Sequence, residues 1–233
     1  MDRPPQLDVV TAEPAHVDGS VALSARVYPD EPPYTRGQIL GQIHAFPDGV
    51  FVALYEGEVV GFAATTLVRE ARVFAQHTWG EISGGGYGAQ FFAGGDWLYG
   101  LEVMVDPARR RLRIGQRLYR ARERLCLDRG LKGIAFGGRM PGWRRQRKSF
   151  DDPQAYFEAV RDGTARDPVL TFQIRAGFEP VRLLRDYAPD DRASGGHAVL
   201  MVWRNPQAGE WTEDQPITRA NPELVRVAAV QMR

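Results

Sequence analysis

Hydrophobic and polar positions along the chain form two patterns: short apolar runs typical of strands, and a four-three-four spacing typical of helices. The clearest helical face is made by Ile114, Leu118, Ala121 and Leu125. It predicts a helix over Ile114–Arg129, with Gly130 as its left-handed cap. Apolar runs at Trp97–Val105 and Gly133–Gly137 flank this helix. The order strand, helix, strand predicts a crossover connection and therefore a parallel pair of strands within the sheet.

Other segments follow the same two patterns. Further strands are predicted at Leu7–Thr11, Gly49–Tyr55, Val59–Val68, Gly177–Val181 and His197–Trp203. Helical segments are predicted at Pro14–Arg26, Pro153–Arg161 and Pro168–Arg175. Prolines predict a loop over Tyr28–Tyr34, and glycines predict an irregular, mobile loop over Gly80–Gly95. The chain therefore combines about seven strands with helices, an α/β pattern.

Length and composition fit a soluble globular protein. The 233 residues are 43% hydrophobic and 25% charged, which excludes disorder along the whole chain. The single cysteine, Cys126, excludes an internal disulfide and a zinc site of several thiolates; its place in the predicted helix indicates packing. The histidines lack the spacing of metal ligands, so we expect no metal. No apolar run approaches the ~18 residues that cross a membrane, and the N-terminus lacks a secretory signal, so we expect a cytoplasmic protein without a membrane partner.

Positive charge is concentrated in one segment. Residues 107–148 hold 15 basic and two acidic residues, a net +13, within a chain of net charge +1. Such a segment favours a locally held anionic ligand, or it is a solvated arginine-rich helix face. Nucleic-acid binding would require exposed aromatic residues interleaved with these charges, and only Tyr119 and Trp143 qualify, so we expect no nucleic-acid partner.

Candidate chemistry lies where the central strand leads into the central helix. The first amides of a helix have no intrahelical partner and carry the positive end of the helix dipole, so they bind anions without any side chain. Gly115 leaves room for a ligand to approach these amides, and the neighbouring arginines add long-range attraction. This arrangement suits a pyrophosphate.

The same passage resembles the signature of the GNAT superfamily of acetyl-CoA-dependent acyltransferases, Val-x-Pro-x-x-Arg-Gly-x-Gly-Ile-Gly-x-x-Leu. The matching residues are Val105, Pro107, Arg110, Ile114, Gly115 and Leu118. Ala176-Gly177-Phe178 stands where the family turns into its sixth strand. The resemblance extends from Leu7 to Trp203. It implies the GNAT fold, a mixed, mostly antiparallel sheet of about seven strands flanked by helices, with residues 1–205 as an acyl-CoA-binding domain.

This resemblance implies a cofactor site and a direct acyl transfer. The implied acetyl-CoA-binding residues are Val103, Met104, Val105, Arg110, Arg111, Leu112, Arg113, Ile114, Gly115 and Gln116. Main-chain groups of Val103 and Val105 would pair with the pantetheine arm, and the amides that follow would hold the pyrophosphate. The amine acceptor must lose a proton before it attacks the thioester. Glu102 is the predicted general base, because it interrupts an apolar strand beside the expected thioester; alternatively it pairs with one of the many arginines.

The chain departs from the family pattern at two positions. Arg113 replaces a glycine of the phosphate loop, so its side chain either crowds the pyrophosphate or turns outward and binds a phosphate of CoA. Gln173 follows Phe172 where many relatives have a tyrosine that acts as general acid, and an amide cannot supply a proton at neutral pH. Tyr187 is the predicted donor of that proton, with a structural role as its alternative. His77 either lines the acceptor cleft or packs in the interior.

A second resemblance points to one GNAT branch, in which the acetyltransferase-like domain precedes a nitrilase-type carbon–nitrogen hydrolase. Arg139–Trp143 and Asp167–Gln173 are similar to that branch, and Val225–Arg233 is similar to the opening strand of a nitrilase domain. We therefore interpret residues 206–233 as a linker and a strand of that kind. Such a strand predicts either a hydrolase-domain partner or a homodimer that exchanges C-terminal segments.

Two functions remain open at this point. The leading hypothesis is an acetyl-CoA-dependent N-acyltransferase acting on a primary amine of a small molecule or a protein. The alternative is a catalytically weak acyl-CoA-binding module that serves an associated hydrolase, which Arg113 and Gln173 favour. The acidic residues Glu81, Asp96, Asp190 and Asp191 either attract a cationic acceptor or are solvated loop charges.

Overall fold

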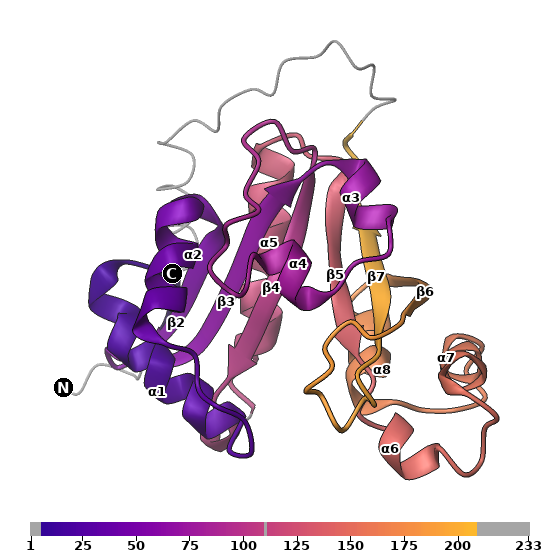
Figure 1. Cartoon of the computed structure of the whole chain (residues 1–233). Coiled ribbons are helices and arrows are strands. Elements are labelled where there is room, and N and C mark those ends of the chain that lie inside the picture. The colour runs from indigo at the N-terminus through magenta and orange to yellow at the C-terminus, as the bar shows by residue number, and fades with distance from the viewer. Residues whose placement is uncertain (1–5, 110, 209–233) are drawn as a thin grey trace.

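The computed structural model describes residues 6–109 and 111–208, which form one seven-stranded sheet flanked by helices (Figure 1). The strands are β1 (Leu7–Thr11), β2 (Val50–Tyr55), β3 (Glu58–Val68), β4 (Trp97–Val105), β5 (Gly133–Arg139), β6 (Glu179–Leu184) and β7 (Ala198–Arg204). Their order is β1-β2-β3-β4-β5-β7-β6. The pair β4–β5 is parallel and every other pair is antiparallel. The expected mixed, mostly antiparallel sheet is confirmed.

Helices cover both faces of this sheet. They are α1 (Val17–Val27), α2 (Arg36–Ala45), α3 (Glu70–Phe74), α4 (Trp79–Ser83), α5 (Ile114–Asp128), α6 (Trp143–Gln146), α7 (Pro153–Arg161) and α8 (Pro168–Arg175). Short 3₁₀ turns lie at Pro14–His16, Pro47–Gly49 and Pro107–Arg109. The core between the sheet and α1, α2 and α4 is separate from the core between the sheet and α5, α7 and α8. Figure 1 shows α1, α2 and α4 in front of the sheet and α5 behind it.

Three helices depart from the sequence-based expectations. The segment Gly80–Gly95, expected to be irregular, begins inside α4, because the side chains of Thr78 and Glu81 cap that helix reciprocally. Thr35 and Gln38 form the same capping box at the start of α2, which was not predicted, and neither was the five-residue α3. Gly177, with a φ of 92°, lies in the turn that follows α8, so β6 starts at Glu179, later than predicted.

Strands β4 and β5 form a fork at the centre of the sheet. They pair only from Trp97 with Gly133 to Gly100 with Phe136, and beyond these residues they diverge (Figure 1). The edge of β4 that faces β5 therefore has no strand partner after Gly100. We call this opening, bounded by β4 after Gly100 and by β5 after Phe136, the fork.

Helix α5, which the apolar spacing predicts, packs mainly against β2, β3 and β4. Its first residue, Ile114, packs on Gly61 of β3, where a Cβ atom would lie only 2.6 Å from Ile114 Cγ2. Glycine at this point lets the N-terminus of α5 approach the sheet closely. No helix within residues 6–109 and 111–208 is long and apolar enough to cross a membrane.

Candidate active site

The turn between β4 and α5 keeps the backbone shape of a glycine loop although arginines occupy it. Arg111 has a φ of 76° and Arg113 a φ of 56°, both in the left-handed region that favours glycine. Both residues are exposed. The turn therefore presents the amides of Ile114, Gly115 and the residue after them, at the start of a 15-residue helix.

A Cβ atom at Gly115 would meet no close contact within the chain. A Cβ atom there would lie 3.8 Å from Val105 Cγ2 and 3.9 Å from Phe172 Cζ, ordinary contact distances, so packing within the chain does not demand glycine. Phe172 of α8 is 40% exposed beside it. The absent side chain and the exposed ring together leave a surface that a ligand can approach.

The structure brings the predicted cofactor residues together, within its described range. Val103, Met104 and Val105 lie on β4 beyond the fork, Arg111, Leu112 and Arg113 form the turn, and Ile114, Gly115 and Gln116 begin α5. Arg110 lies outside the described residues, as do residues 209–233, which include the predicted strand Val225–Arg233.

Glu102, the predicted base, is held by two tyrosines, and no arginine among residues 6–109 and 111–208 pairs with its carboxylate. The Tyr28 hydroxyl donates to Glu102 Oε1 at 2.9 Å and the Tyr34 hydroxyl donates to Oε2 at 3.0 Å. The amide of Val103 also donates to Oε1, at 2.8 Å. Both tyrosines come from the segment between α1 and α2, which the sequence predicted only as a loop. This half-buried carboxylate is thus fixed beside the unpaired edge of β4.

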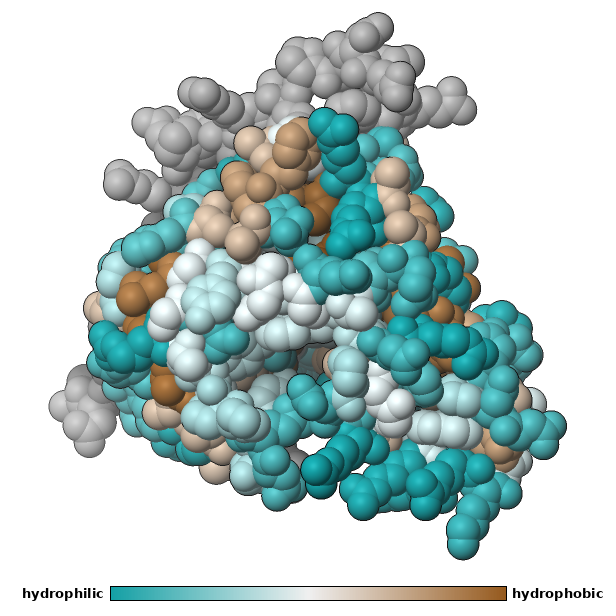
Figure 2. Space-filling model, viewed as in Figure 1, coloured by the Kyte–Doolittle hydropathy of each residue, from teal (hydrophilic) through white to brown (hydrophobic). Residues whose placement is uncertain are grey.

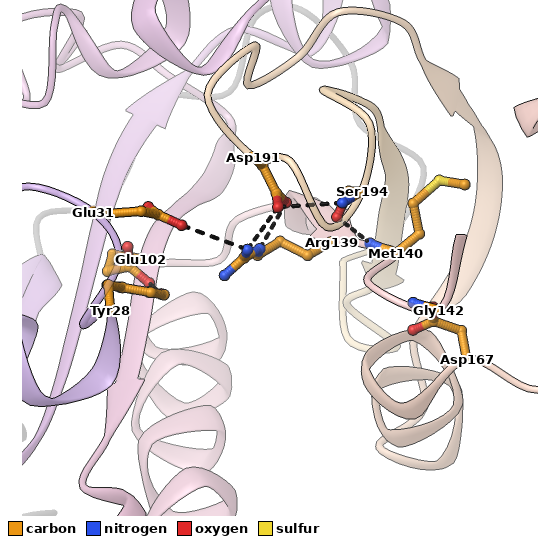
Figure 3. Close-up of polar contacts among 9 residues, drawn as sticks. All are labelled: Tyr28, Glu31, Glu102, Arg139, Met140, Gly142, Asp167, Asp191 and Ser194. Carbon is orange, nitrogen blue, oxygen red and sulfur yellow. Dashed lines mark hydrogen bonds and ion pairs between the residues drawn. The ribbon is translucent and has the colours of Figure 1, made fainter. Parts of the chain in front are cut away.

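The guanidinium group of Arg139 joins the segment between α1 and α2 to the β5 side of the fork (Figure 3). Arg139, at the end of β5, donates to both oxygens of Asp191, at 2.7 and 2.6 Å. Its Nη2 also lies 3.7 Å from Glu31 Oε1. Burial alone would raise the pKa of Asp191, but hydrogen bonds from Arg139 and from Ser194 hold it below its ordinary value. The bridge therefore links β5, the β6–β7 loop and the segment that holds Glu102.

Tyr187 lies in a buried chain of hydrogen bonds. His77 Nδ1 contacts the carbonyl of Ala75 at 2.8 Å, and His77 Nε2 contacts the Tyr99 hydroxyl at 2.8 Å. The Tyr187 hydroxyl lies 3.1 Å from that of Tyr99. Burial lowers the pKa of His77, which favours a neutral ring. A neutral ring with Nδ1–H bound to a carbonyl requires Tyr99 to donate to Nε2, and hence Tyr187 to donate to Tyr99.

A second buried polar cluster lies on the other face of the sheet, and the sequence analysis did not bring its members together; Tyr119, considered there for an exposed aromatic face, is buried. It consists of Tyr119 and Arg122 of α5 and Gln173 of α8. Arg122 Nη2 donates to the carbonyl oxygens of Ala64 at 2.9 Å and of Glu102. These carbonyls lie at the β-bulge where the register of β3 and β4 shifts. Burial of Arg122 could have been predicted from the sequence, because it follows Leu118 by four residues and so lies on the apolar face of α5.

Other residues singled out in the sequence have structural roles. Asp96 accepts from the amide of Glu70 and pairs with Lys132, Glu81 caps α4, and Asp191 pairs with Arg139. Cys126 is buried, and burial raises its pKa to about 12, which agrees with packing. Among the described residues, no group of three or more His, Cys, Asp or Glu side chains is placed to hold a metal ion.

The face that carries α1, α2 and α4 is hollowed between that part of the molecule and the part that carries α6 and α7 (Figure 2). Strongly hydrophilic residues lie along the lower rim of the hollow. Tyr28 and Tyr34, which hold Glu102, pack on the core of this face, whereas the turn before α5 leads into the helix on the other face.

Several known proteins are similar to this chain in sequence or in fold. The model of the acetyltransferase (GNAT) family matches residues 21–142. The uncharacterized N-acetyltransferase YkwB of Bacillus subtilis (strain 168) is 31% identical over 178 residues, 76% of this chain and 78% of that protein. The probable hydrolase YhcX of the same organism is 36% identical over 193 residues, 83% of this chain but only 37% of that protein. The solved structure of the GphF GNAT-like decarboxylase in complex with isobutyryl-CoA is 26% identical, with a TM-score of 0.72, and the match covers 84% of this chain and 98% of that one.

Proposed function

The chain belongs to the acetyltransferase (GNAT) family, and on that premise we propose that it transfers an acetyl or other short acyl group from coenzyme A to a primary amine. The observation that carries the proposal is the fork, with an unpaired edge of β4 leading into the glycine-shaped turn before α5. The strand edge offers main-chain partners to the pantetheine amides. The turn offers unpaired helix amides to the pyrophosphate. Acyl-CoA is thus the co-substrate that fits the site.

Glu102 fits the role of general base in this reaction. Its carboxylate stands beside the fork, on the face that carries α1 and α2, and the Tyr28 and Tyr34 hydroxyls fix its orientation. It would remove a proton from the ammonium group so that the amine nitrogen can attack the thioester carbonyl carbon. Tyr187 is the sequence-based candidate for returning a proton to the departing thiolate.

The acceptor side favours a cation. Glu102 on β4 and Glu31 in the segment between α1 and α2 face the fork from the same side. Asp190 adds an exposed carboxylate in the β6–β7 loop. Arg139 is already neutralised by its bidentate pair with Asp191. We therefore propose a protonated amine, on a small molecule or a protein, as the acceptor.

A thiol-release screen tests the proposed function. Purified protein is incubated with acetyl-CoA and, separately, with isobutyryl-CoA, against polyamines, aminoglycosides, amino acids and peptides with free N-termini. The proposal predicts CoA release that requires both one of the donors and an amine. Release that no amine accelerates, despite tight CoA binding, would contradict it.

A second function draws support from the similarity to YhcX. This chain spans only 37% of that protein's length, and that protein is named a probable hydrolase. We propose as the alternative that the domain is a catalytically weak acyl-CoA-binding module serving an associated carbon–nitrogen hydrolase. Tight CoA binding without transfer to any amine would favour this alternative.

A further inference from the structure

We propose that Arg139 is a positioning residue for the acyl transfer, which acts on the base Glu102 by holding Tyr28, the residue whose hydroxyl orients that carboxylate. The inference rests on the proposed function, because it requires Glu102 to be the general base. Arg139 forms its own hydrogen bonds and ion pairs with Asp191 and Glu31 and none with Glu102. It therefore acts from the end of β5 through the segment between α1 and α2 (Figure 3).

Each of the two tyrosines that hold Glu102 has a support of its own. The ring of Tyr34 lies edge-on to that of Trp79 in α4, at 6.3 Å between centroids. Trp79 is itself tied to β4, because its indole Nε1 donates to a carbonyl oxygen of that strand at 3.0 Å. The guanidinium of Arg139 lies over the ring of Tyr28, with 5.6 Å between Cζ and the ring centroid. Arg139 thus supports Tyr28 as Trp79 supports Tyr34.

The segment that carries Tyr28 has few backbone hydrogen bonds of its own. Three of the eight residues 28–35 are prolines, which have no amide hydrogen to donate. The amide of Glu31 donates to the Tyr28 carbonyl at 3.2 Å. Arg139 Nη2 lies 3.7 Å from Glu31 Oε1, so the guanidinium contacts the segment at two places three residues apart. Side-chain contacts with Arg139 therefore help to fix the position of Tyr28.

The guanidinium of Arg139 rests on a firm support on its other side. Asp191 accepts two hydrogen bonds from it and also accepts from the amide of Ser194, at 3.2 Å. The amide of Asp191 donates to the carbonyl of Ala188 at 2.9 Å, within the same loop. The Ser194 hydroxyl accepts from the amide of Met140, the residue after Arg139, at 3.0 Å. These bonds close a ring between the β6–β7 loop and the end of β5, which holds the guanidinium in place.

The charge of Arg139 adds to its effect on Tyr28. Hydrogen bonds to Asp191 raise the pKa of Arg139 above its ordinary value, so the guanidinium stays charged. Burial and the Glu102 carboxylate raise the pKa of Tyr28 well above its ordinary value, and the charge of Arg139 opposes that rise. A cation over the ring makes the phenol a stronger hydrogen-bond donor. Arg139 therefore strengthens the bond that orients Glu102.

A purely structural role is the competing interpretation. Arg139 would then only tie the end of β5 to the β6–β7 loop, and its loss would lower stability without a particular effect on Glu102. Arg182 of β6 offers a matched comparison, because it too ties distant segments together. It donates to the carbonyl oxygens of Phe74 and Ala75, at 2.9 and 2.6 Å.

The test compares kcat and KM for thiol release, with acetyl-CoA as donor and the most reactive amine of the thiol-release screen as acceptor. Arg139→Gln should lower kcat by roughly tenfold, because the base loses part of its orientation. The KM for acetyl-CoA should change by less than about twofold, since the cofactor residues of β4 and α5 are unchanged. Arg182→Gln should leave both constants within about twofold of those of the unmodified chain.

A double-mutant cycle with Tyr28→Phe separates positioning from a structural role. In the Tyr28→Phe chain, Arg139→Gln should lower kcat by less than about a further twofold, because the hydroxyl through which it acts is gone. Additive losses, an equal loss in Arg182→Gln, or a change confined to KM would overturn the positioning role and leave the proposed function standing. Absence of amine-dependent CoA release from the unmodified chain would overturn both.

A second variant covers the case in which Arg139→Gln does not fold because Asp191 is left without its cation. In the double variant Arg139→Gln/Asp191→Asn the two amides can pair, and no lone charge remains in the loop. This variant should show the same loss of kcat. An unchanged kcat in the folded double variant would overturn the positioning role.

Discussion

Tyr28 and Glu102 lie 74 residues apart in the sequence, yet the tyrosine hydroxyl donates a 2.9 Å hydrogen bond to the carboxylate. Tyr34 completes the arrangement by donating to the other carboxylate oxygen. The segment between α1 and α2 thereby fixes a charged group at the unpaired edge of β4. Its orientation is set before any substrate binds, as positioned catalytic groups require.

Glu102→Gln removes the proposed base and changes little else. The amide can still accept from one tyrosine, so the fold and CoA affinity should persist. We expect kcat for thiol release with an amine acceptor to fall by about 10²–10³-fold, the usual contribution of a general base. The matched control is Glu58→Gln on the neighbouring strand β3, whose carboxylate pairs with surface arginines. Equal losses in the two variants would contradict the role of Glu102.

Tyr28→Phe tests whether the tyrosine acts through Glu102. Loss of one hydrogen bond to a positioned carboxylate should lower kcat by roughly tenfold, equivalent to about 1.4 kcal/mol. In a Glu102→Gln background the same substitution should have almost no further effect on kcat, because both changes remove one function. The measurement is a double-mutant cycle: kcat of the unmodified chain, the two single variants and the double variant. Additive losses would show that Tyr28 acts independently of Glu102.

Arg113→Gly should stabilise the chain. A left-handed φ of 56° strains any side chain but not glycine, and relief of that strain outweighs the greater freedom of glycine in the unfolded state by about 0.5–1 kcal/mol. Chemical unfolding measures the change. Arg120→Gly, at an exposed position within α5, is the matched control and should destabilise by about 1 kcal/mol. Destabilisation of similar size in both variants would mean that the turn is not strained at Arg113.

His77 predicts a loss of stability in mild acid. Burial lowers its pKa below the ordinary value of 6.5, so the unfolded chain binds this proton more readily than the folded one. The contribution to stability is complete above pH 6.5 and falls, by up to about 1.4 kcal/mol per pH unit, as the pH drops towards the folded-state pKa. His77→Gln, which can still accept from Tyr99, should flatten the dependence.

His197 complicates that measurement, because burial lowers its pKa as well. His197→Asn keeps an acceptor for the amide of Asp186 and removes the second titration. Between pH 5 and 7 the unfolding free energy of His197→Asn should still fall in acid. In the double variant His77→Gln/His197→Asn it should not. A persistent slope in the double variant would assign the effect to other groups.

The fold was largely predictable because its main elements are strongly patterned. The apolar face of α5 and the apolar runs on either side of it specify the crossover that makes β4 and β5 parallel. Helix α2 was not predicted, because Ile39 and Ile43 are its only buried apolar residues and two positions do not make a recognisable helical pattern. Its capping box at Thr35 and Gln38 was readable and indicates where such short helices begin.

The site was predictable only in part. Glu102 stands out in an apolar strand, but its partners Tyr28 and Tyr34 come from a proline-rich loop whose position depends on tertiary packing. Pairing with an arginine was the natural alternative in so basic a segment, and the structure shows hydroxyl donors in its place. Arg122 was counted only as one of the basic residues of its segment, although its spacing from Leu118 places it on the buried face of α5.

Calorimetric titration with acetyl-CoA tests the central claim most directly, comparing the unmodified chain with Gly115→Glu and Gly80→Glu. Both glycines are the second residue of a helix, so each variant places a carboxylate at an equivalent position, in α5 and in α4. We expect the unmodified chain and Gly80→Glu to bind acetyl-CoA alike, and Gly115→Glu to bind at least about tenfold more weakly, a loss of about 1.4 kcal/mol or more. Equal binding by all three would contradict a pyrophosphate site at the start of α5, and no binding by the unmodified chain would contradict an acyl-CoA-dependent function altogether.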